Sequence, residues 1–374
     1  MFTADELAAT SNGLKKTVTT VTQRDGRKFT ESRAKRGDSV LTIELPQTEE
    51  ERNAMAAALR PDALSLTLTS EMAAATSEAN SRPADQLRIV TWNIWFDPSR
   101  QDERLQMLLS EALRTAPDII ALQEVVPRVA EAIRSCMTLN ALYVVSPFSI
   151  SQYGVLMLVR RSLAPTFSIA PLPSQMGRSL LIATCATVVV ATVHLESLNN
   201  APTRRAQLEK AREAFDEPSA GTPESRPQRP AVLCGDFNFD SMQNWGDWRR
   251  GIHREEQPRP AQAAPLENAV LESTLGAEFV DAWAAVWPNE AGLTYDGARN
   301  PLCRDALEQM RYDRVMARGL TPVGARLLGV NGATEGATTS AGRPDHLAGV
   351  HDAAPPVCPS DHFGVCVDLV VSQS

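Results

Sequence analysis

Polar and ionisable side chains stand at the ends of apolar runs in this sequence, where they could act together. The residues in question are Asn93, Glu124, His194, Asp236 and the pair Asp361-His362. Carboxylate and carboxamide oxygens are the ligands that Mg²⁺ and Mn²⁺ prefer. Hydrolysis of a phosphate ester needs a cation at the phosphoryl oxygens, a base for the water and donors for the transition state. The set predicts this chemistry.

Individual roles follow from the residue types. Glu124 is the candidate metal ligand, and Asp236, two residues before Asn238, suits a base whose water is also held by an amide. His362 can donate to a phosphoryl oxygen if it stays protonated, and Asp313 is a carboxylate partner for it. Each residue alone also has a structural explanation, as a solvated strand end, a turn or a satisfied histidine.

The elements that must position these residues alternate between strands and helices. The predicted strands are Leu87–Ile94, Asp118–Glu124, Val155–Val159, Leu180–Thr184, Thr187–His194, Ala231–Asp236, Tyr312–Met316 and Val365–Val371, and the predicted helices are Asp102–Thr115 and Thr203–Phe215. Apolar strands of this kind need cover on both faces. We therefore expect an α/β sandwich of two packed sheets flanked by helices, with the polar strand ends at one rim.

The composition of the sequence changes near residue 87. Residues 1–86 are polar and patchy, and we expect a partly disordered N-terminal extension and linker. Residues 87–374 are the expected catalytic domain, in which 329–357, rich in Gly, Ala, Thr and Pro, form a loose insertion.

Composition excludes some classes of protein. The chain has 374 residues and a net charge of −8, which counts against a broad basic surface that coats nucleic acid. Its 6 cysteines lack zinc-like spacing and are expected to be reduced thiols. No secretory leader and no run of about 20 apolar residues is evident, so we expect an intracellular protein without a membrane span.

Six short motifs, taken in order, resemble those of the endonuclease/exonuclease/phosphatase superfamily. They are Thr91-Trp92-Asn93-Ile94, Leu122-Gln123-Glu124-Val125, His194-Leu195-Glu196-Ser197, Gly235-Asp236-Phe237-Asn238, Arg311-Tyr312-Asp313-Arg314 and Ser360-Asp361-His362. This resemblance covers residues 87–371.

Within the superfamily the motif sequences are most similar to those of the 5′-tyrosyl-DNA phosphodiesterases. The shared motifs are His194-Leu195-Glu196-Ser197 with Arg205 and Gln207, Pro173-Ser174-Gln175-Met176-Gly177-Arg178, Leu293-Thr294-Tyr295-Asp296 and Pro359-Ser360-Asp361-His362-Phe363-Gly364. The resemblance implies a four-layer α/β sandwich of mixed sheets and dependence on Mg²⁺, with Mn²⁺ as an alternative. We expect a monomer. The resemblance also implies DNA repair by hydrolysis of the bond between a topoisomerase II tyrosine and a DNA 5′ end, which leaves a 5′-phosphate. That substrate suggests the nucleus, with the cytoplasm as a second compartment.

The resemblance also assigns roles within the catalytic motifs. Asn93 and Glu124 would hold metal and phosphate, and Asp236 with Asn238 would position the water. His362, oriented by Asp313 and preceded by Asp361, would stabilise the phosphoryl charge.

Further residues would bind substrate. His194 and Ser197 would contact the phosphate or the adjoining nucleotide. The DNA-end groove would be lined by Tyr153, Arg178, Tyr295 and Tyr312. For the three tyrosines a place in the core or rim is the alternative, and Arg178 has the alternative of a solvated loop cation.

Two positions depart from the family pattern. Trp95 stands where the superfamily commonly has an aspartate, which puts a second carboxylate near the metal in doubt and leaves Asp97 as a substitute. Tyr295 replaces a tryptophan, which gives a smaller stacking face.

Two other functions remain open from the sequence. One keeps the fold with another substrate, as in an abasic-site endonuclease, an RNA deadenylase or a phosphatase of inositol or sphingolipid head groups. The other is a non-catalytic scaffold for DNA ends, against which the combination of Glu124, Asp236, Asn238 and His362 argues.

Overall fold

The computed structural model describes the chain mainly from residue 85 onward. The described residues are 16–22, 28–34, 66, 68, 78, 82–83, 85–216, 229–254, 256, 258–330 and 358–371. Most of the predicted N-terminal extension and nearly all of the predicted insertion at 329–357 therefore lie outside the described residues. The domain boundary at residue 87 stays a prediction.

The first compact unit of the chain contains a hairpin that we did not predict. Strands β1 (Lys16–Thr22) and β2 (Lys28–Ala34) pair antiparallel, with Lys16 opposite Ala34. The two large sheets belong to the other unit.

Two six-stranded sheets form the centre of the second unit. In spatial order, the first sheet consists of β15 (Leu320–Leu328), β16 (Gly364–Val371), β3 (Gln86–Asn93), β4 (Ile119–Val125), β6 (Gly154–Arg160) and β5 (Tyr143–Val145). The second sheet consists of β11 (Val280–Asp281), β14 (Asp313–Arg318), β10 (Ala231–Asp236), β9 (Val189–His194), β8 (Ser179–Thr184) and β7 (Thr166–Pro171). A short sheet pairs β12 (Tyr295–Asp296) with β13 (Gln309–Met310).

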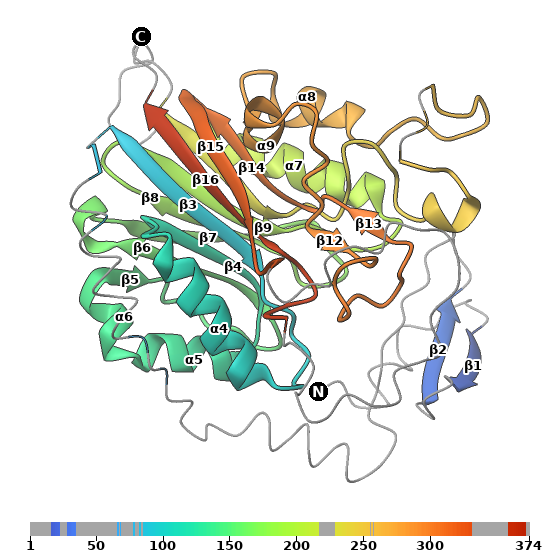
Figure 1. Ribbon diagram of the computed structural model, residues 1–374, viewed down its shortest axis with the longest axis horizontal. Helices are drawn as coiled ribbons and strands as arrows, with labels where there is room; N and C mark the ends of the chain where they lie inside the picture. The colour runs from blue at the N-terminus through green and yellow to red at the C-terminus, as the bar shows by residue number, and fades with distance from the viewer. Residues whose placement is uncertain are drawn as a thin grey trace, which may run out of the picture. The chain divides into compact units, whose positions relative to one another are not determined.

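Helices cover the outer faces of both sheets (Figure 1). On the first sheet lie α4 (Gln101–Arg114), α5 (Pro127–Ser135) and α6 (Met137–Leu142), and on the second lie α7 (Ala201–Asp216) and α8 (Ala269–Leu275). Helix α9 (Ala282–Val286) packs at the core between the sheets. Two single turns of 3₁₀ helix, η1 (Arg161–Leu163) and η2 (Trp248–Arg250), complete the helical elements among the described residues. The predicted α/β sandwich of two packed mixed sheets flanked by helices is confirmed.

Local sequence explains why these segments take these forms. Strand β3 is buried at nearly every position, as expected for a strand covered on both faces. Helix α4 places Leu105, Leu108, Leu109 and Ala112 on one buried face, with Asp102 in its first turn to suit the helix dipole. Full burial of one such leucine contributes roughly 1.5–3 kcal/mol.

Each sheet has a pair of parallel strands in its middle, and this detail positions the site. Strands β3 and β4 run parallel in one sheet, and β9 and β10 run parallel in the other. Strands β16 and β14 are antiparallel to these neighbours. The carboxyl ends of the parallel strands and the amino ends of β14 and β16 are therefore brought to a common rim.

The described helices and cysteines bear on two further expectations. Among the described residues, we find no helix with the length and apolar character that crossing a bilayer would require. All six cysteines are free thiols, and Cys185 and Cys234 are buried, as the apolar runs around them predicted.

Candidate active site

The carboxyl ends of four parallel strands bring Asn93, Glu124, His194 and Asp236 together. Asn93 Nδ2 donates to Asp236 Oδ2 over 3.0 Å. His194 Nε2 lies 3.5 Å from Asp236 Oδ2 and 3.9 Å from Glu124 Oε1. Side chains that are 143 residues apart in sequence, such as Asn93 and Asp236, thus share one small volume.

A glycine allows this approach between β9 and β10. Asp236 stands directly opposite His194 in the parallel register. The preceding Gly235 has a φ of +133°, and a Cβ there would lie 2.0 Å from the carbonyl oxygen of Val193. Only glycine fits, because any side chain would push the two strands apart.

The backbone at the site is held in left-handed conformations at non-glycine residues. Glu124 has a φ of 59° where the pairing of β4 with β6 is irregular between Leu122 and Val125. Trp95 and Asn238 have φ values of 59° and 56°. Such conformations cost of order 1–3 kcal/mol each and concentrate at functional sites, so the fold stabilises them for their side-chain directions.

Asp236 is a buried carboxylate beside other acids. Burial, together with the neighbouring charge of Asp313, raises the pKa of Asp236 to about 6. Its Oδ1 accepts a hydrogen bond from the backbone N–H of Asn238 over 2.8 Å. The Asn238 amide is fixed in turn, because its Nδ2 donates to the carbonyl of Leu195 over 3.0 Å. A carboxylate with a raised pKa and an oriented amide next to it suit a general base and its water.

His362 and Asp313 form a buried pair on the same rim. His362 Nδ1 lies 2.7 Å from Asp313 Oδ2. Burial opposes a charge on this imidazole, but the ion pair and hydrogen bond with Asp313 raise the pKa of His362 well above its usual value. The Trp92 indole holds the segment by donating to the His362 carbonyl over 2.9 Å. The ring is thus a fixed cation that can donate from its other nitrogen.

The pKa values of Asp361 and His194 are shifted in opposite directions by burial and by nearby charges. Burial, with Glu124 nearby, raises the pKa of Asp361 to about 7. Burial and the charges of Arg178 and His362 lower the pKa of His194 well below its usual value. The rim therefore holds one charged and one neutral histidine.

The donor set fits a divalent cation. One ligand atom each from Asp236, Asp313 and His362 lie within 4.8 Å of one another. Within the described residues Asp313 Oδ1 is buried without a hydrogen-bond partner. His362 Nδ1 already bonds Asp313, so the carboxylates are the better donors of this group. Glu124 and Asn93 stay the predicted ligands, and Asp236 and Asp313 are added as candidates.

A model of the endonuclease/exonuclease/phosphatase family matches residues 90–362. The chain belongs to this family. The match includes every residue described above at the rim, and the family is one of phosphoesterases. No curated protein sequence matches the chain.

Solved structures of the same fold come from several organisms. TDP2 of D. rerio, complexed with single-stranded DNA product, is 20% identical, with a TM-score of 0.54 over 76% of this chain and 98% of its own. Truncated TDP2 of Caenorhabditis elegans is 21% identical, with a TM-score of 0.53 over 76% and 97%. A family protein of Bacteroides thetaiotaomicron is 15% identical, with a TM-score of 0.50 over 77% and 99%. At these identities the likeness shows the fold.

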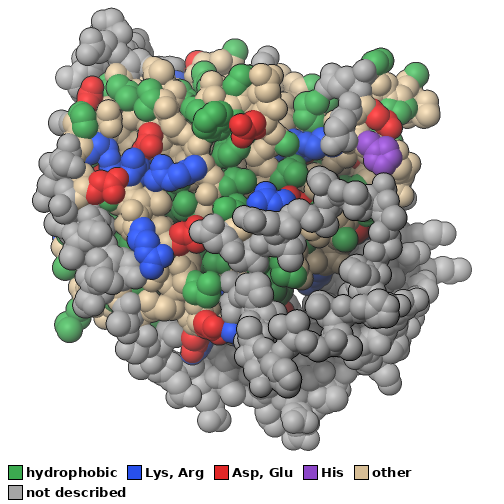
Figure 2. All heavy atoms as spheres, in the orientation of Figure 1, with side chains coloured by type: hydrophobic (Ala, Val, Ile, Leu, Met, Phe, Trp, Pro, Cys, Tyr) green, Lys and Arg blue, Asp and Glu red, His purple; other side chains and the backbone are tan. Residues whose placement is uncertain are grey.

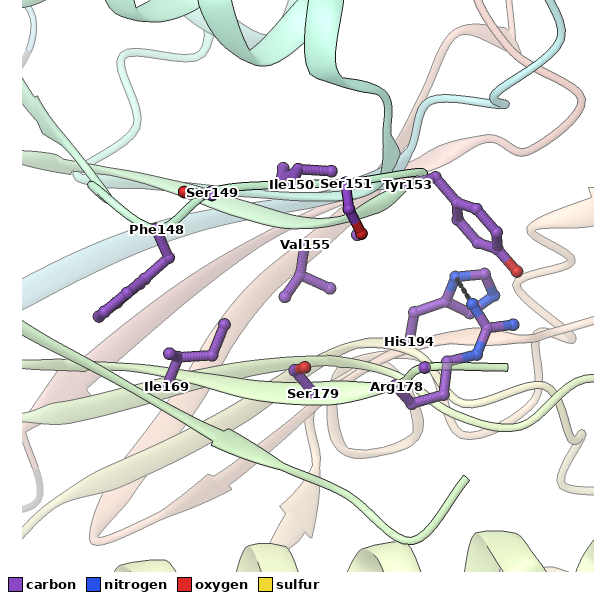
Figure 3. A pocket seen from close by; sticks show the side chains of 12 residues that line it. Phe148, Ser149, Ile150, Ser151, Tyr153, Val155, Ile169, Arg178, Ser179 and His194 are labelled. Carbon is purple, nitrogen blue, oxygen red and sulfur yellow. Dashed lines mark hydrogen bonds between the residues drawn. The ribbon is translucent and has the colours of Figure 1, made fainter. Parts of the chain in front are cut away.

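Tyr153 and Arg178 lie beside His194, as part of a cavity of about 140 Å³. Arg178 Nη1 lies 2.9 Å from His194 Nδ1, and its guanidinium lies 5.2 Å from the centre of the Tyr153 ring. Figure 3 shows these three at one end of the cavity and Phe148 and Ile169 at the other. Arg178 is buried, which argues against the alternative of a solvated loop cation.

Tyr295 and Tyr312 are placed differently from the expectation of a stacking surface. Their exposed fractions are 7% and 4%, and both pack with Trp248 and Met310. Their ring centres lie 5.1 and 6.2 Å from that of His362. The burial favours the alternative of core aromatics that support the histidine, because their faces are mostly covered.

Three more sequence candidates are placed as follows. Ser197 is half-buried, and its carbonyl accepts from Asn200 Nδ2 over 2.6 Å. Trp95 donates its backbone N–H to Asn93 Oδ1 over 3.0 Å. Asp97 Oδ1 accepts from the N–H of Ser99 over 2.8 Å, so this carboxylate caps its own loop. Substrate contact by Ser197 stays a prediction.

Sequence reasoning missed Arg104, a buried cation in α4. Its guanidinium donates to backbone carbonyls of the loop that follows β3, including Ile94 over 3.0 Å, and to that of Pro359 over 3.3 Å. The same loop supplies the N–H of Phe96 to Glu124 Oε2 over 3.1 Å. Arg104 thus ties two rim segments together. Its position in the helix gave no signal, since an arginine between Glu103 and Leu105 usually reaches solvent.

Proposed function

We propose that this protein is a Mg²⁺-dependent phosphodiesterase that hydrolyses 5′-phosphotyrosyl bonds between topoisomerase II and DNA ends. The product is a 5′-phosphate end suited to ligation, and the process is DNA repair. The observation that carries the hydrolase part is the juxtaposition of Asp236, whose pKa is raised, with the charged pair of His362 and Asp313. Environments that separate two groups in this way assign a base and an acid.

The proposed catalytic role of each residue follows from its hydrogen-bond partners and from nearby charges. Asp236 accepts a proton from water that the fixed amide of Asn238 orients. The His362 imidazolium, held by Asp313, donates to a phosphoryl oxygen as charge grows there. Glu124 and Asn93 would hold a divalent cation that neutralises phosphoryl charge, with Mn²⁺ as an alternative to Mg²⁺.

The proposed substrate rests on the sequences of the motifs and on the cavity beside His194. The motifs around Arg178, His194, Tyr295 and His362 resemble those of the 5′-tyrosyl-DNA phosphodiesterases. The D. rerio relative in fold was solved with a single-stranded DNA product. The cavity joins apolar walls to a cationic, aromatic end, a combination that accepts a phenol side chain.

The surface suits local recognition of a DNA end. In Figure 2, basic and acidic side chains are interspersed on the described part of the visible face. With a net charge of −8, binding would rely on a few arginines near the site. We extend the proposal to a monomer that meets this substrate in the nucleus, and also in the cytoplasm.

A single assay tests the proposal. Purified protein should release tyrosine from a 5′-tyrosyl oligonucleotide in Mg²⁺, stop in EDTA and recover when Mg²⁺ is restored. Abasic duplex DNA, poly(A) and an inositol phosphate serve as parallel substrates. Cleavage of one of these without tyrosine release would show that the substrate assignment is wrong, while the family assignment would stand. No activity on any of them, with metal bound, would favour a scaffold.

A further inference from the structure

Glu196 is a buried carboxylate to which the proposed chemistry gives no role. It follows His194 by two residues in the His-Leu-Glu-Ser motif, and its exposed fraction is 1%. Its oxygens accept hydrogen bonds from Ser174 Oγ over 2.6 Å, Gln175 N over 2.9 Å and Gln207 Nε2 over 3.3 Å. A buried carboxylate is costly unless its partners are in place, so this arrangement calls for a reason.

Two of the three partners of Glu196, Ser174 and Gln175, belong to the turn that carries Arg178. Ser174 gives its single hydroxyl proton to Glu196, which leaves its lone pairs to accept. They accept from the backbone N–H groups of Met176 over 2.9 Å and Arg178 over 3.1 Å. Gln207 of α7 holds the start of the turn at the carbonyl of Pro173 over 2.9 Å. The carboxylate therefore fixes the backbone of Arg178 through one serine.

Arg178 in turn decides which nitrogen of His194 bears the proton. A guanidinium only donates, so His194 Nδ1, 2.9 Å from Arg178 Nη1, must accept. The proton of the neutral ring then lies on Nε2. That nitrogen lies 3.5 Å from Asp236 Oδ2 and 3.9 Å from Glu124 Oε1. The other tautomer would place an N–H against the guanidinium and a bare lone pair against two carboxylates.

We propose that Glu196 is a positioning residue that holds the turn from Pro173 to Arg178, so that Arg178 locks His194 in its Nε2–H tautomer. The imidazole then presents a donor toward the acids and the phosphate position. The kinetic part of this inference rests on the proposed function, and the part about the tautomer does not.

The competing explanation is that Glu196 only fastens the turn to α7. Gln207 Oε1 accepts from the N–H of Glu196 over 2.8 Å, so the two residues do form a structural tie. A purely structural tie would affect stability and leave the tautomer unchanged. The state of the His194 ring therefore separates the two explanations.

The decisive measurement is ¹⁵N NMR of histidine-labelled full-length protein. In the parent protein His194, recognised by the signals lost in His194→Gln, should show a bare Nδ1 and a protonated Nε2. Glu196→Gln should give a mixture of both tautomers. Asp118→Asn is the control, since this half-buried carboxylate bonds Arg82 and Arg88 at the opposite end of the strands and should leave the His194 signals unchanged.

Kinetics on the 5′-tyrosyl oligonucleotide supply a second readout. Glu196→Gln should lower kcat by about 10–100-fold, the usual effect of losing a partner that orients a functional side chain. If the residue acts through Arg178, adding Glu196→Gln to Arg178→Ala should change kcat by less than about threefold.

Two results would overturn the proposal. One is an unchanged His194 tautomer in Glu196→Gln. The other is a double variant whose loss in kcat equals the product of the losses in Glu196→Gln and Arg178→Ala. Should Glu196→Gln not fold, Ser174→Ala removes one hydroxyl from the same link and should shift the tautomer in the same direction. A parent protein that is inert on the oligonucleotide would contradict the proposed function alone, because the NMR result does not depend on substrate.

Discussion

Strands β3, β4 and β16 carry charged residues at both ends, and the two ends are built in opposite ways. At one end Arg88 Nε bonds Asp368 Oδ1 over 2.5 Å. Asp118 Oδ2 accepts from the N–H of Arg88 over 2.8 Å and from Arg82 Nη1 over 2.5 Å. Each of these carboxylates meets a guanidinium, so the charges are matched where they leave water.

At the rim, acids meet acids: Glu124 lies on β4, Asp361 lies just before β16, and Asp236 ends β10 of the other sheet. Asp236 and Asp361 are buried, and their pKa values are raised, by burial first and then by other carboxylates. The positive charges near Asp361 at this end are those of His362 and Arg104. A carboxyl group whose folded pKa lies above its unfolded value opposes folding once it is ionised. The contrast indicates that the matched end stabilises the sandwich and that the rim gives up stability for reactivity.

The largest effect that this comparison predicts comes from Asp236→Asn. Loss of the general base should lower the rate of phosphoester hydrolysis by about 10²–10⁴-fold. Because the ionised Asp236 opposes folding at neutral pH, the unfolding temperature should not fall. Stopped assays and calorimetry on the same preparation measure both. A rate loss under tenfold would remove Asp236 from the role of base.

Asp313→Asn should give the next largest effect, on the order of 10–100-fold in rate. Asp313 raises the pKa of His362, so without it the imidazolium loses its proton at lower pH. The alkaline limb of the pH profile should therefore move to lower pH. The acidic limb, which reports Asp236, should lie at or below about pH 6 in the parent protein, since a bound cation favours the carboxylate. An alkaline limb that stays in place would show that another group is titrating.

The rim could be predicted because its residues are marked by local patterns. Asn93, Glu124 and Asp236 follow apolar strands, and parallel strands end at one edge. The central strands and both long helices were predicted with small shifts at their ends. Edge strands β7 and β15 were missed, because their mixed burial produces neither alternation nor a continuous apolar run.

What the sequence could not show depends on contacts between distant segments. Arg104 acts on carbonyls that only the folded loops bring within reach. Glu196 holds a turn whose residues lie 21 and 22 positions earlier in the chain. For Tyr295 and Tyr312 the sequence left open a DNA-facing place or a place in the core or rim, and Trp248 packs with them beside His362. Exposure of an aromatic residue is set by such packing, which periodicity does not encode.

The smallest effect on rate is expected from Asp368→Asn, the same substitution as Asp236→Asn at the opposite end of the sandwich. Asp368 is partly exposed and bonds Arg88 and the more exposed Arg326. Losing the charge should reduce the free energy of unfolding by roughly 1–2 kcal/mol, less than for a fully buried pair. Hydrolysis should continue at the parent rate, because no reacting group is touched. Urea titration and the oligonucleotide assay measure the two quantities. If Asp368→Asn slowed hydrolysis as strongly as Asp236→Asn, the division between a stabilising end and a reactive end would be wrong.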